Sequence, residues 1–302
     1  MSQANISGIA NVDKPAGLTS HDVVAAVRRA SGQRRVGHAG TLDPVATGVL
    51  IICLGEATRV VEYLMAGRKV YEAWVHLGVE TDTYDATGAV VATGAAEQIT
   101  RAEIEETLSQ FIGVIEQVPP MYSAIKRDGQ PLYRLARRGI EVARDARLVE
   151  IQEIQVRDWA PPILHLQITC GKGTYIRSLA HDLGQALGCG GHLARLVRTA
   201  SGRFTLEEAT PLDTLLESLR QHDGENYLLP LDAALSDYPA LTVDAETDAR
   251  LRHGQAVELP DVSPSDSDHL RVYGPDGAFV ALLRYDIAAA RWRPDKVFAS
   301  PL

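Results

Sequence analysis

Two segments of the chain alternate apolar and polar residues with a period of two. In residues 69–77 and 163–170 every second position is apolar. These positions are Tyr71, Ala73, Val75 and Leu77 in the first segment and Leu164, Leu166, Ile168 and Cys170 in the second. The alternation predicts two β-strands with one buried face each. The segment Val49–Leu54 is apolar throughout and predicts a buried strand.

Three further segments show the helical pattern. Thr19 and Ser20 are good N-caps for a helix that Gly32 ends, and Thr100 with Glu103 has the spacing of a capping box. Gly171 and Gly173 turn the chain into a third helix, predicted from about residue 174 to Gly188. The apolar positions of the three helices are Val23, Val24 and Val27; Ile104, Leu108 and Phe111; and Leu179, Leu183 and Leu187.

The character of the chain changes near residues 228–239. Beyond them, short β runs at 257–259, 270–273 and 279–285 are separated by turn residues, and 274–277 (Gly-Pro-Asp-Gly) is a hairpin signal. Strands and helices do not alternate regularly, and no glycine-rich phosphate loop follows a strand. We therefore predict an α+β protein in which residues 1–235 form a domain around a mixed, largely antiparallel sheet. Residues 236–302 are predicted to form a small β-rich domain.

The composition of the 302 residues is that of an ordinary globular protein, with 45% hydrophobic and 23% charged residues. No apolar run approaches the roughly 20 residues that span a bilayer, and no signal segment is evident, so we expect a cytoplasmic protein. The cysteines Cys53, Cys170 and Cys189 lack the spacing of a zinc site or a disulfide framework.

The distribution of charge suggests local rather than general affinity for nucleic acid. A net charge of −9 argues against nonspecific coating of phosphates. Four arginines nevertheless fall between residues 28 and 35 without an acid. Residues 119–150, here called the basic insert, carry seven basic and four acidic residues. A solvated face is the ordinary interpretation of one such cluster. Two clusters near candidate catalytic motifs favour RNA.

The segment 37–48 (GHAGTLDPVATG) is the strongest candidate for chemistry. Three glycines and Pro44 constrain the backbone around a single acid, Asp43, and the strand Val49–Leu54 anchors the loop to the core. An acid in such a loop often serves only to cap a turn. A constrained loop also suits a positioned reactive carboxylate.

This loop closely resembles the active-site motif of the TruB family of tRNA pseudouridine synthases. Further similar segments follow in the family's order. They are 13–20 (DKPAGLTS), 69–71 (KVY), 78–88 (GVETDTYDATG), 118–124 (VPPMYSA), 171–179 (GKGTYIRSL) and 192–202 (HLARLVRTASG). The resemblance implies a synthase that isomerises uridine-55 in the T arm of tRNA by base flipping, without a cofactor or a metal. It also implies a pseudouridine synthase fold with a C-terminal PUA-like RNA-binding domain, which the tail matches only weakly.

The resemblance assigns roles to individual residues. Asp43 is the expected catalytic carboxylate and Arg177 its cationic partner, while His38, Tyr71, Tyr175 and Leu196 are expected to form the base site. His38 would fill the space that the flipped base vacates, and Tyr71 would stack on the uracil. Whether Asp43 bonds to the base, bonds to the sugar or removes a sugar proton stays open. The expected RNA contacts are Lys14, Arg134, Arg137 and Arg138. Lys14 has a second interpretation, in which it packs against the Asp43 loop.

Two other functions are compatible with parts of the pattern. A noncatalytic tRNA-binding or RNA-folding protein would explain the basic clusters and the β-rich tail, but not the intact Asp43 motif. A metal-dependent phosphoesterase could use Asp43, Asp82 and Asp85. Their spacing lacks the dense oxygen ligands of a calcium loop, and Asp82 and Asp85 are better interpreted as organising a turn and binding its hydroxyls or nearby arginines.

Overall fold

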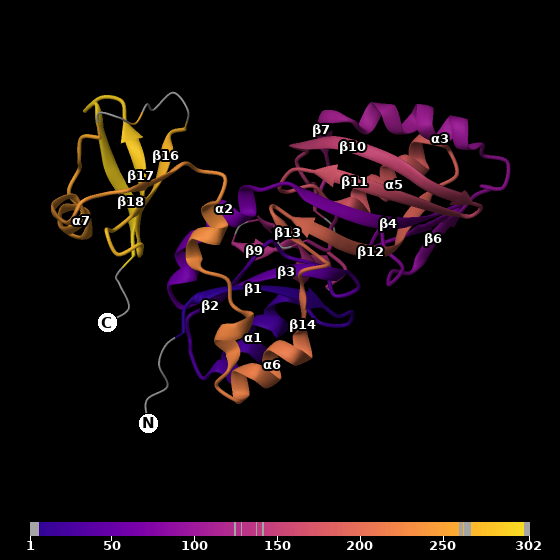
Figure 1. Ribbon diagram of the computed structural model, residues 1–302. Coiled ribbons are helices and arrows are strands. Elements are labelled where there is room, and N and C mark those ends of the chain that lie inside the picture. The colour runs from indigo at the N-terminus through magenta and orange to yellow at the C-terminus, as the bar shows by residue number, and fades with distance from the viewer. Residues whose placement is uncertain are drawn as a thin grey trace.

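A ten-stranded mixed sheet forms the centre of the larger domain (Figure 1). The computed structural model describes residues 6–123, 125–127, 129–136, 138–140, 142–259, 262 and 267–298. The main path of the sheet is, in spatial order, β14 (Thr210–Pro211), β1 (Gly8–Lys14), β3 (Thr47–Leu54), β12 (Gly191–Ser201), β4 (Lys69–Leu77), β11 (Ile163–Cys170), β10 (Arg147–Ala160) and β7 (Gly113–Gln117). β2 (Val36–Ala39) pairs with β3, and β13 (Phe204–Thr205) pairs with β12.

Most neighbouring strands of this sheet are antiparallel. The parallel pairs are β1 with β14 and β3 with β12. Residues 69–77 and 163–170 form β4 and β11 with the predicted bounds, and their predicted apolar faces are buried. The prediction of an α+β fold with a mixed, largely antiparallel sheet is confirmed.

Four helices cover one face of the sheet, and their apolar residues form one core with the residues that the strands direct toward them. These helices are α1 (Ser20–Ser31), α3 (Arg101–Leu108), α5 (Ile176–Ala186) and α6 (Leu212–Arg220). α1 has the predicted capping box at Thr19 and ends at Gly32, which is left-handed. α5 begins two residues later than predicted because Tyr175 keeps an extended backbone as its N-cap.

Short helices cover the other face of β1 and β3. They are η1 (Gly55–Val60), α2 (Val61–Ala66) and η4 (Leu231–Leu235), while η2 (Ser109–Phe111) and η3 (Gly224–Tyr227) lie elsewhere. In β3, Leu50 and Ile52 join the first core, whereas Val49 and Ile51 join a second core with these helices. The strand is therefore buried on both faces, which explains its uninterrupted apolar sequence.

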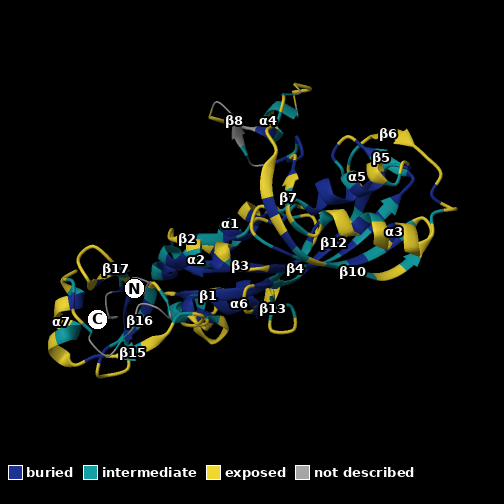
Figure 2. Ribbon diagram, turned by 90° about the horizontal axis from the view of Figure 1, so that it is seen from above, coloured by how far each residue is buried: buried dark blue, intermediate teal, exposed yellow. Residues whose placement is uncertain are grey.

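Two excursions leave the sheet. β5 (Val79–Thr81) and β6 (Val90–Thr93) pair as a small ribbon. The basic insert contains β8 (Lys126–Arg127), β9 (Gln130–Pro131) and α4 (Leu132–Ala136), and in Figure 2 α4 stands away from the body of the domain. Its last four residues belong to β10, so the sheet resumes earlier than the predicted end of the insert.

A separate four-stranded sheet lies near the C-terminus. It comprises β15 (Ala240–Thr242), β16 (His269–Tyr273), β17 (Phe279–Asp286) and β18 (Arg291–Val297), with α7 (Ala245–Arg252) beside it. The predicted hairpin turn joins β16 to β17. The predicted strand at 257–259 is wrong, because only Val257 makes an isolated bridge. The boundary at 235/236 stays a prediction.

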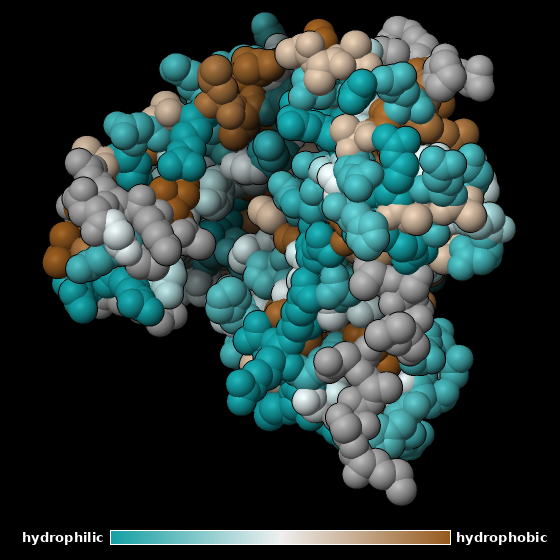
Figure 3. Space-filling model, turned by 90° about the vertical axis from the view of Figure 1, so that its left-hand side faces the viewer, coloured by the Kyte–Doolittle hydropathy of each residue, from teal (hydrophilic) through white to brown (hydrophobic). Residues whose placement is uncertain are grey.

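The C-terminal sheet is docked on α2 and η1. Lys296 Nζ lies 2.9 Å from Glu62 Oε1, and the Arg59 guanidinium lies 5.0 Å from the centre of the Phe298 ring. Leu282 and Phe298 complete the second core. The face that this domain presents in Figure 3 is mostly hydrophilic, with scattered apolar patches. Within the described ranges, none of the helices has the length and hydrophobicity that a bilayer crossing requires.

Candidate active site

Asp43 lies in the loop that joins β2 to β3. Gly40 and Gly48 have φ values of 86° and 96°, as the sequence predicted for a constrained loop. A Cβ atom at Gly48 would lie 2.3 Å from the Arg198 carbonyl oxygen, so only glycine fits there. Ala46 N donates to Asp43 O at 3.1 Å and closes a turn. The loop thus holds Asp43 between two fixed strands.

The Asp43 carboxylate contacts Arg177 through both oxygens. Arg177 Nη2 donates to Oδ1 at 3.1 Å, and Arg177 Nε lies 2.9 Å from Oδ2. The Arg177 side chain is only 4% exposed, whereas that of Asp43 keeps 35%, so the acid remains accessible. Burial raises the pKa of Asp43, and the Arg177 guanidinium opposes this shift by stabilising the ionised form. The structure brings together the two residues that the sequence analysis paired.

Asp85 is a second carboxylate on Arg177. Its Oδ2 lies 3.5 Å from Arg177 Nη1. Its Oδ1 accepts from Thr83 Oγ1 at 2.8 Å and from Thr87 N at 2.9 Å. Asp82 caps the same turn by accepting from Ala89 N at 2.9 Å. These contacts agree with the interpretation of both acids as turn organisers, and the contact of Asp85 with Arg177 agrees with the expectation that these acids bind nearby arginines.

The beginning of α5 and the end of β7 are joined around Arg177. Gln117 accepts from Tyr175 N at 2.8 Å and donates to Tyr175 O at 3.1 Å. Ser178 Oγ donates to the Val118 carbonyl at 2.8 Å. Arg177 Nη2 also donates to the Tyr122 carbonyl at 2.9 Å. The base of the basic insert is therefore fixed directly beside the Asp43 site.

Two buried cations, Lys14 and Arg198, donate to backbone carbonyls of the Asp43 loop. Lys14 is fully buried, and its Nζ donates to the carbonyls of Pro15 and Leu18 at 2.8 Å and to that of Pro44 at 3.4 Å. Burial lowers the pKa of Lys14 to about 8, which Asp43 partly opposes. The expectation that Lys14 contacts RNA is corrected. The fold commits its ammonium group to three backbone oxygens, in line with the alternative that it packs against the loop.

Arg198 is the second of these cations. It is 1% exposed, and its guanidinium donates to the carbonyls of Val49 at 2.7 Å, Gly40 at 2.9 Å and Thr41 at 3.4 Å. These oxygens lie on both sides of Asp43 in the chain. The sequence analysis missed Arg198 as an individual residue. The signal was its place in the motif at 192–202, but a charge within a strand does not reveal that it is buried.

Two of the predicted base-site residues, Tyr71 and Tyr175, lie close enough to Asp43 to feel its charge. Tyr71 is 9% exposed on β4, and its hydroxyl interacts with Arg198. Burial raises the pKa values of Tyr71 and Tyr175, and the Asp43 charge adds to both shifts. Leu196 lies on β12 opposite Ala73 of β4. The parallel ladder between β12 and β3 covers Val197 and Arg198, just beyond Leu196.

His38 lies on β2, five residues before Asp43. Its ring is partly buried, with its centre 5.5 Å from that of His21. Burial lowers the pKa of His38 to about 4, so the imidazole is neutral at neutral pH. A neutral ring suits the predicted role of filling the space left by a flipped base.

The predicted RNA-binding arginines have different positions. Arg134, on α4, and Arg138 are exposed. Arg137 lies outside the described residues. In the N-terminal cluster, Arg28 Nη2 donates to the Val36 carbonyl at 2.7 Å, and Arg35 pairs with Glu56. Part of that cluster therefore serves the protein's own fold.

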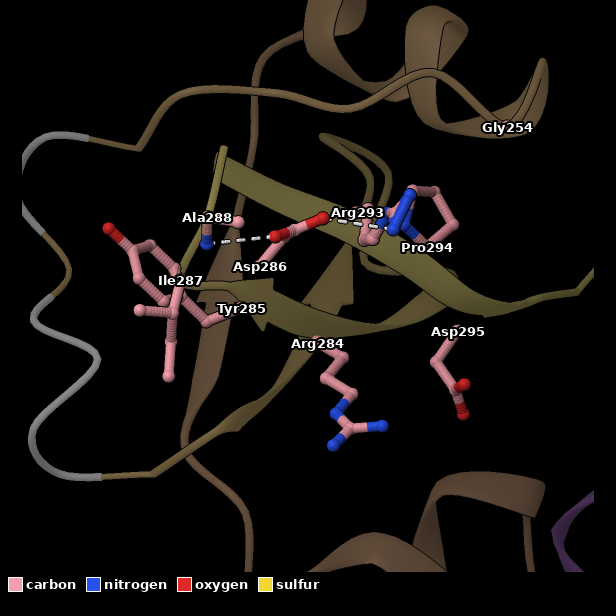
Figure 4. A pocket seen from close by; sticks show the side chains of 9 residues that line it. All are labelled: Gly254, Arg284, Tyr285, Asp286, Ile287, Ala288, Arg293, Pro294 and Asp295. Atoms are coloured by element: carbon pink, nitrogen blue, oxygen red, sulfur yellow. Dashed lines mark hydrogen bonds and ion pairs between the residues drawn. The ribbon is translucent and has the colours of Figure 1, made fainter. Parts of the chain in front are cut away.

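A polar hollow of about 730 Å³ lies on the C-terminal sheet (Figure 4). Asp286 there accepts from Ala288 N at 3.1 Å and pairs with Arg293 at 2.9 Å. Tyr285 and Ile287 line the same hollow. It belongs to the separate domain, and its residues match none of the active-site motifs. Among the described residues, no three His, Cys, Asp or Glu side chains form a group that could hold a metal ion.

Three family models match consecutive parts of the chain. The family model described as TruB family pseudouridylate synthase (N terminal domain) matches residues 28–176. The tRNA pseudouridylate synthase B C-terminal domain model matches residues 177–236, and that of Pseudouridine synthase II TruB, C-terminal, matches residues 239–282.

Curated relatives and solved structures cover nearly the whole chain. A tRNA pseudouridine synthase B of Dehalococcoides mccartyi is 45% identical over 97% of both chains, and one of Symbiobacterium thermophilum is 48% identical over 84% of both. The structure titled a Cbf5-Nop10-Gar1 complex has a chain with a TM-score of 0.74 and 27% identity, covering 97% of this chain and 85% of its own. A chain in the structure of an H/ACA RNP bound to a substrate RNA containing 2'-deoxyuridine has a TM-score of 0.72 and 25% identity, and the match covers 97% of this chain and 85% of that chain. The chain therefore belongs to the TruB family of pseudouridylate synthases.

Proposed function

We propose that the protein isomerises uridine-55 in the T arm of tRNA to pseudouridine, with Asp43 as the essential carboxylate. The observation that carries this proposal is the contact of both Asp43 oxygens with the buried Arg177 at 2.9 and 3.1 Å. The names of the relatives support the substrate class, because the curated relatives are tRNA pseudouridine synthases.

The reaction requires the protein mainly to position the nucleotide and to supply charge. The N1–C1′ bond of uridine breaks, the uracil turns, and a C5–C1′ bond forms while the proton on C5 is lost and N1 gains one. Atoms and electrons balance without an oxidant or a cofactor. What the site must supply is an ionised carboxylate, walls that retain the detached base, and exclusion of water.

Arg177 favours the ionised form of Asp43, which partial burial opposes. A buried carboxylate without a cation would favour its protonated form. Arg177 contacts Asp43 and is itself fixed by Asp85 and the Tyr122 carbonyl. The guanidinium is therefore preorganised, and its position need not change as the reaction proceeds.

The two tyrosines and Leu196 provide walls for a flipped uracil. Extrusion of a stacked base costs a few kcal/mol, which contacts in the pocket offset. We infer that Tyr71 stacks on the uracil, that Tyr175 bounds the pocket, and that the Leu196 backbone contacts the base. His38 then occupies the vacated space in the RNA.

The basic residues near the site favour a polyanion. Arg177 offsets the charge of Asp43 and Asp85, and the buried Lys14 and Arg198 add positive charge beside the Asp43 loop. The exposed Arg134 and Arg138 of the basic insert, together with Arg137, add attraction for phosphates. We infer that the C-terminal domain acts as a PUA-like RNA-binding domain.

The decisive experiment is Asp43→Asn, which keeps the shape of the side chain and removes its charge. Pseudouridine formation on a tRNA transcript should fall by about a thousandfold or more, since a positioned carboxylate typically contributes on this scale. The dissociation constant for tRNA should stay within about threefold, because phosphate contacts dominate affinity. Asp82→Asn is the matched control. It changes an exposed acid of the neighbouring turn and should retain wild-type turnover.

The same assay separates the other functions. Turnover by Asp43→Asn at the wild-type rate would overturn the catalytic assignment. Wild-type protein that binds tRNA but produces no pseudouridine would indicate a noncatalytic RNA-binding protein. Shortened RNA or released phosphate would indicate a phosphoesterase.

A further inference from the structure

An aromatic pair, Tyr84 and His181, lies next to the residues that contact Arg177. Tyr84 directly precedes Asp85, and His181 lies one helical turn after Arg177 on α5. The two rings stack with centres 3.9 Å apart and planes 11° apart. We propose that Tyr84 and His181 are positioning residues that hold Asp85 on Arg177 and thereby set the Arg177–Asp43 geometry. The inference rests on the proposed function.

The backbone of Tyr84 indicates that its place is imposed by its surroundings. Its φ is 64°, the left-handed region that non-glycine residues rarely adopt. Such a conformation costs on the order of 1 kcal/mol or more and persists where contacts over-determine it. Here Tyr84 O accepts from Leu193 N at 3.0 Å, and Leu193 O accepts from Ala86 N at 3.0 Å. β12 holds the backbone of the turn, while His181 holds the ring.

The Glu80 carboxylate, on β5, lies beside the His181 ring. His181 Nδ1 lies 3.5 Å from Glu80 Oε1, and the His181 side chain is 15% exposed. Glu80 Oε2 accepts from Gln185 Nε2 at 2.7 Å. Burial lowers the pKa of His181, with Glu80 opposing and Arg144 adding to the shift, so a neutral ring faces Tyr84 at neutral pH. The stack therefore ties the turn to the helix that carries Arg177.

The residues on either side of Tyr84 both contact Arg177. Arg177 Nη1 donates to the Thr83 carbonyl at 3.4 Å and lies 3.5 Å from Asp85 Oδ2. A displacement of Tyr84 would displace both contacts. The stack and these two contacts connect the same turn to the same helix face, since residues four apart on a helix are neighbours.

A second histidine stack provides a matched control. The His165 ring stacks on Trp74 at 4.3 Å and 8°, and His165 Nε2 lies 2.6 Å from Glu72 Oε2. Trp74 lies on β4 between Ala73 and Val75, so its side chain is on the sheet face opposite to theirs and to that of Tyr71. His165→Ala therefore removes a similarly stacked histidine ring, with a closer carboxylate contact, on the other side of the sheet.

The experiment compares single-turnover rates on a T-arm hairpin, dissociation constants and melting temperatures. The variants are His181→Ala, His181→Phe, Tyr84→Gly and His165→Ala. His181→Ala and Tyr84→Gly should each slow the reaction about tenfold, because small misplacements of reacting groups are costly, with RNA affinity unchanged. Glycine adopts the left-handed backbone without strain, so Tyr84→Gly tests the ring alone. His181→Phe should retain the rate by keeping a stacked ring.

The pH dependence of the single-turnover rate distinguishes a positioning role from a general loss of stability, which would not change it. Asp43 faces Arg177, Asp85, Lys14, Tyr71 and Tyr175. Arg177 acts on the pKa of Asp43 more strongly than Asp85 does. If His181→Ala loosens the contacts of both Arg177 and Asp85 with the site, the pKa of Asp43 should rise. The acidic side of the pH–rate profile should then move to higher pH in His181→Ala and stay at its wild-type position in His165→Ala.

The possible outcomes are distinct. If His181→Ala and Tyr84→Gly match His165→Ala in rate and acid limb, the stack is ordinary packing and the inference is overturned. If both lose the fold, or if His181→Phe is as slow as His181→Ala, a positioning role through ring stacking is also overturned. Normal turnover by Asp43→Asn, measured in parallel, would instead overturn the proposed function, regardless of the rates of the His181 and Tyr84 variants.

Discussion

Arg177 and Arg198 are buried at the Asp43 site, whereas Arg134 and Arg138 of the basic insert are exposed. Arg177 and Arg198 are 4% and 1% exposed, and each has several fixed acceptors. The two regions meet at the base of the insert, where the Tyr122 carbonyl accepts from Arg177.

The difference reflects two uses of charge. Burying a cation costs several kcal/mol of desolvation unless fixed acceptors offset it, so a buried arginine is held in one geometry. That geometry is what a reacting group requires. An exposed arginine keeps its hydration and its rotamers, and it attracts phosphates in a manner that weakens with salt. We therefore expect substitutions at the site to change rate and stability, and substitutions in the insert to change affinity.

Arg198→Met should produce the largest change in stability. It leaves the carbonyls of Gly40, Thr41 and Val49 without their donor, and such losses in a buried site amount to about 2–4 kcal/mol of unfolding free energy. The single-turnover rate should also fall, since these oxygens hold the Asp43 loop. Denaturant unfolding and the tRNA assay measure the two effects.

Arg195→Met is the control for this change. Arg195 lies three residues earlier on β12, is exposed, and rests over the Trp74 ring at 4.4 Å. Its replacement should cost about 1 kcal/mol or less, as for an exposed cation–π contact. Equal losses for the two variants would mean that burial of Arg198 does not secure the loop.

Replacing the three arginines of the basic insert should have a smaller and different effect. The triple variant Arg134→Ala, Arg137→Ala and Arg138→Ala should bind tRNA about tenfold more weakly, and each lost phosphate contact should reduce the salt slope by roughly 0.7 to 0.9. Melting temperature and the rate at saturating RNA should stay near wild type. Titrations at several salt concentrations measure the slope.

A control with the same change in net charge uses arginines that already contact carboxylates. These are Arg101, Arg220 and Arg291. Their triple replacement by alanine should leave the salt slope nearly unchanged. If the insert variant instead keeps wild-type affinity and slope while its melting temperature falls, its arginines are structural and the contrast between the regions fails.

Removal of divalent metals should have the smallest effect. Arg177 supplies the positive charge next to Asp43, and the isomerisation needs no Lewis acid. Turnover of a T-arm hairpin that folds without magnesium should therefore survive exhaustive chelation. Loss of turnover under these conditions, restored by magnesium, would favour the phosphoesterase interpretation and remove the electrostatic role given to Arg177.

Local sequence patterns predicted most elements of the larger domain. The alternation at 69–77 and 163–170 marked β4 and β11, and Thr19 and Gly32 marked the two ends of α1. These signals are readable because the backbone period and the end caps of an element depend on residues a few positions apart.

The C-terminal domain was harder to predict. β18 carries Pro294 and several charged residues, so its alternation is weak, and proline is tolerated there because β18 is an edge strand. β15 has three residues, and α7 has little apolar surface. Short edge elements obtain their stability from the sheet that they join, which no local pattern records.

Local patterns were sufficient to identify the family motifs, the constrained glycine loop around Asp43, and the segments that carry Asp43 and Arg177. Which charges are buried, and what they contact, follows from the assembled fold. Lys14 changed from a predicted RNA contact to a buried support of the loop, Arg198 emerged as a second support, and Asp85 joined Arg177 from a turn. The reason is physical. The cost of desolvating a charge, and the acceptors that offset it, depend on strands and helices that are distant in sequence and become neighbours only when the sheet assembles.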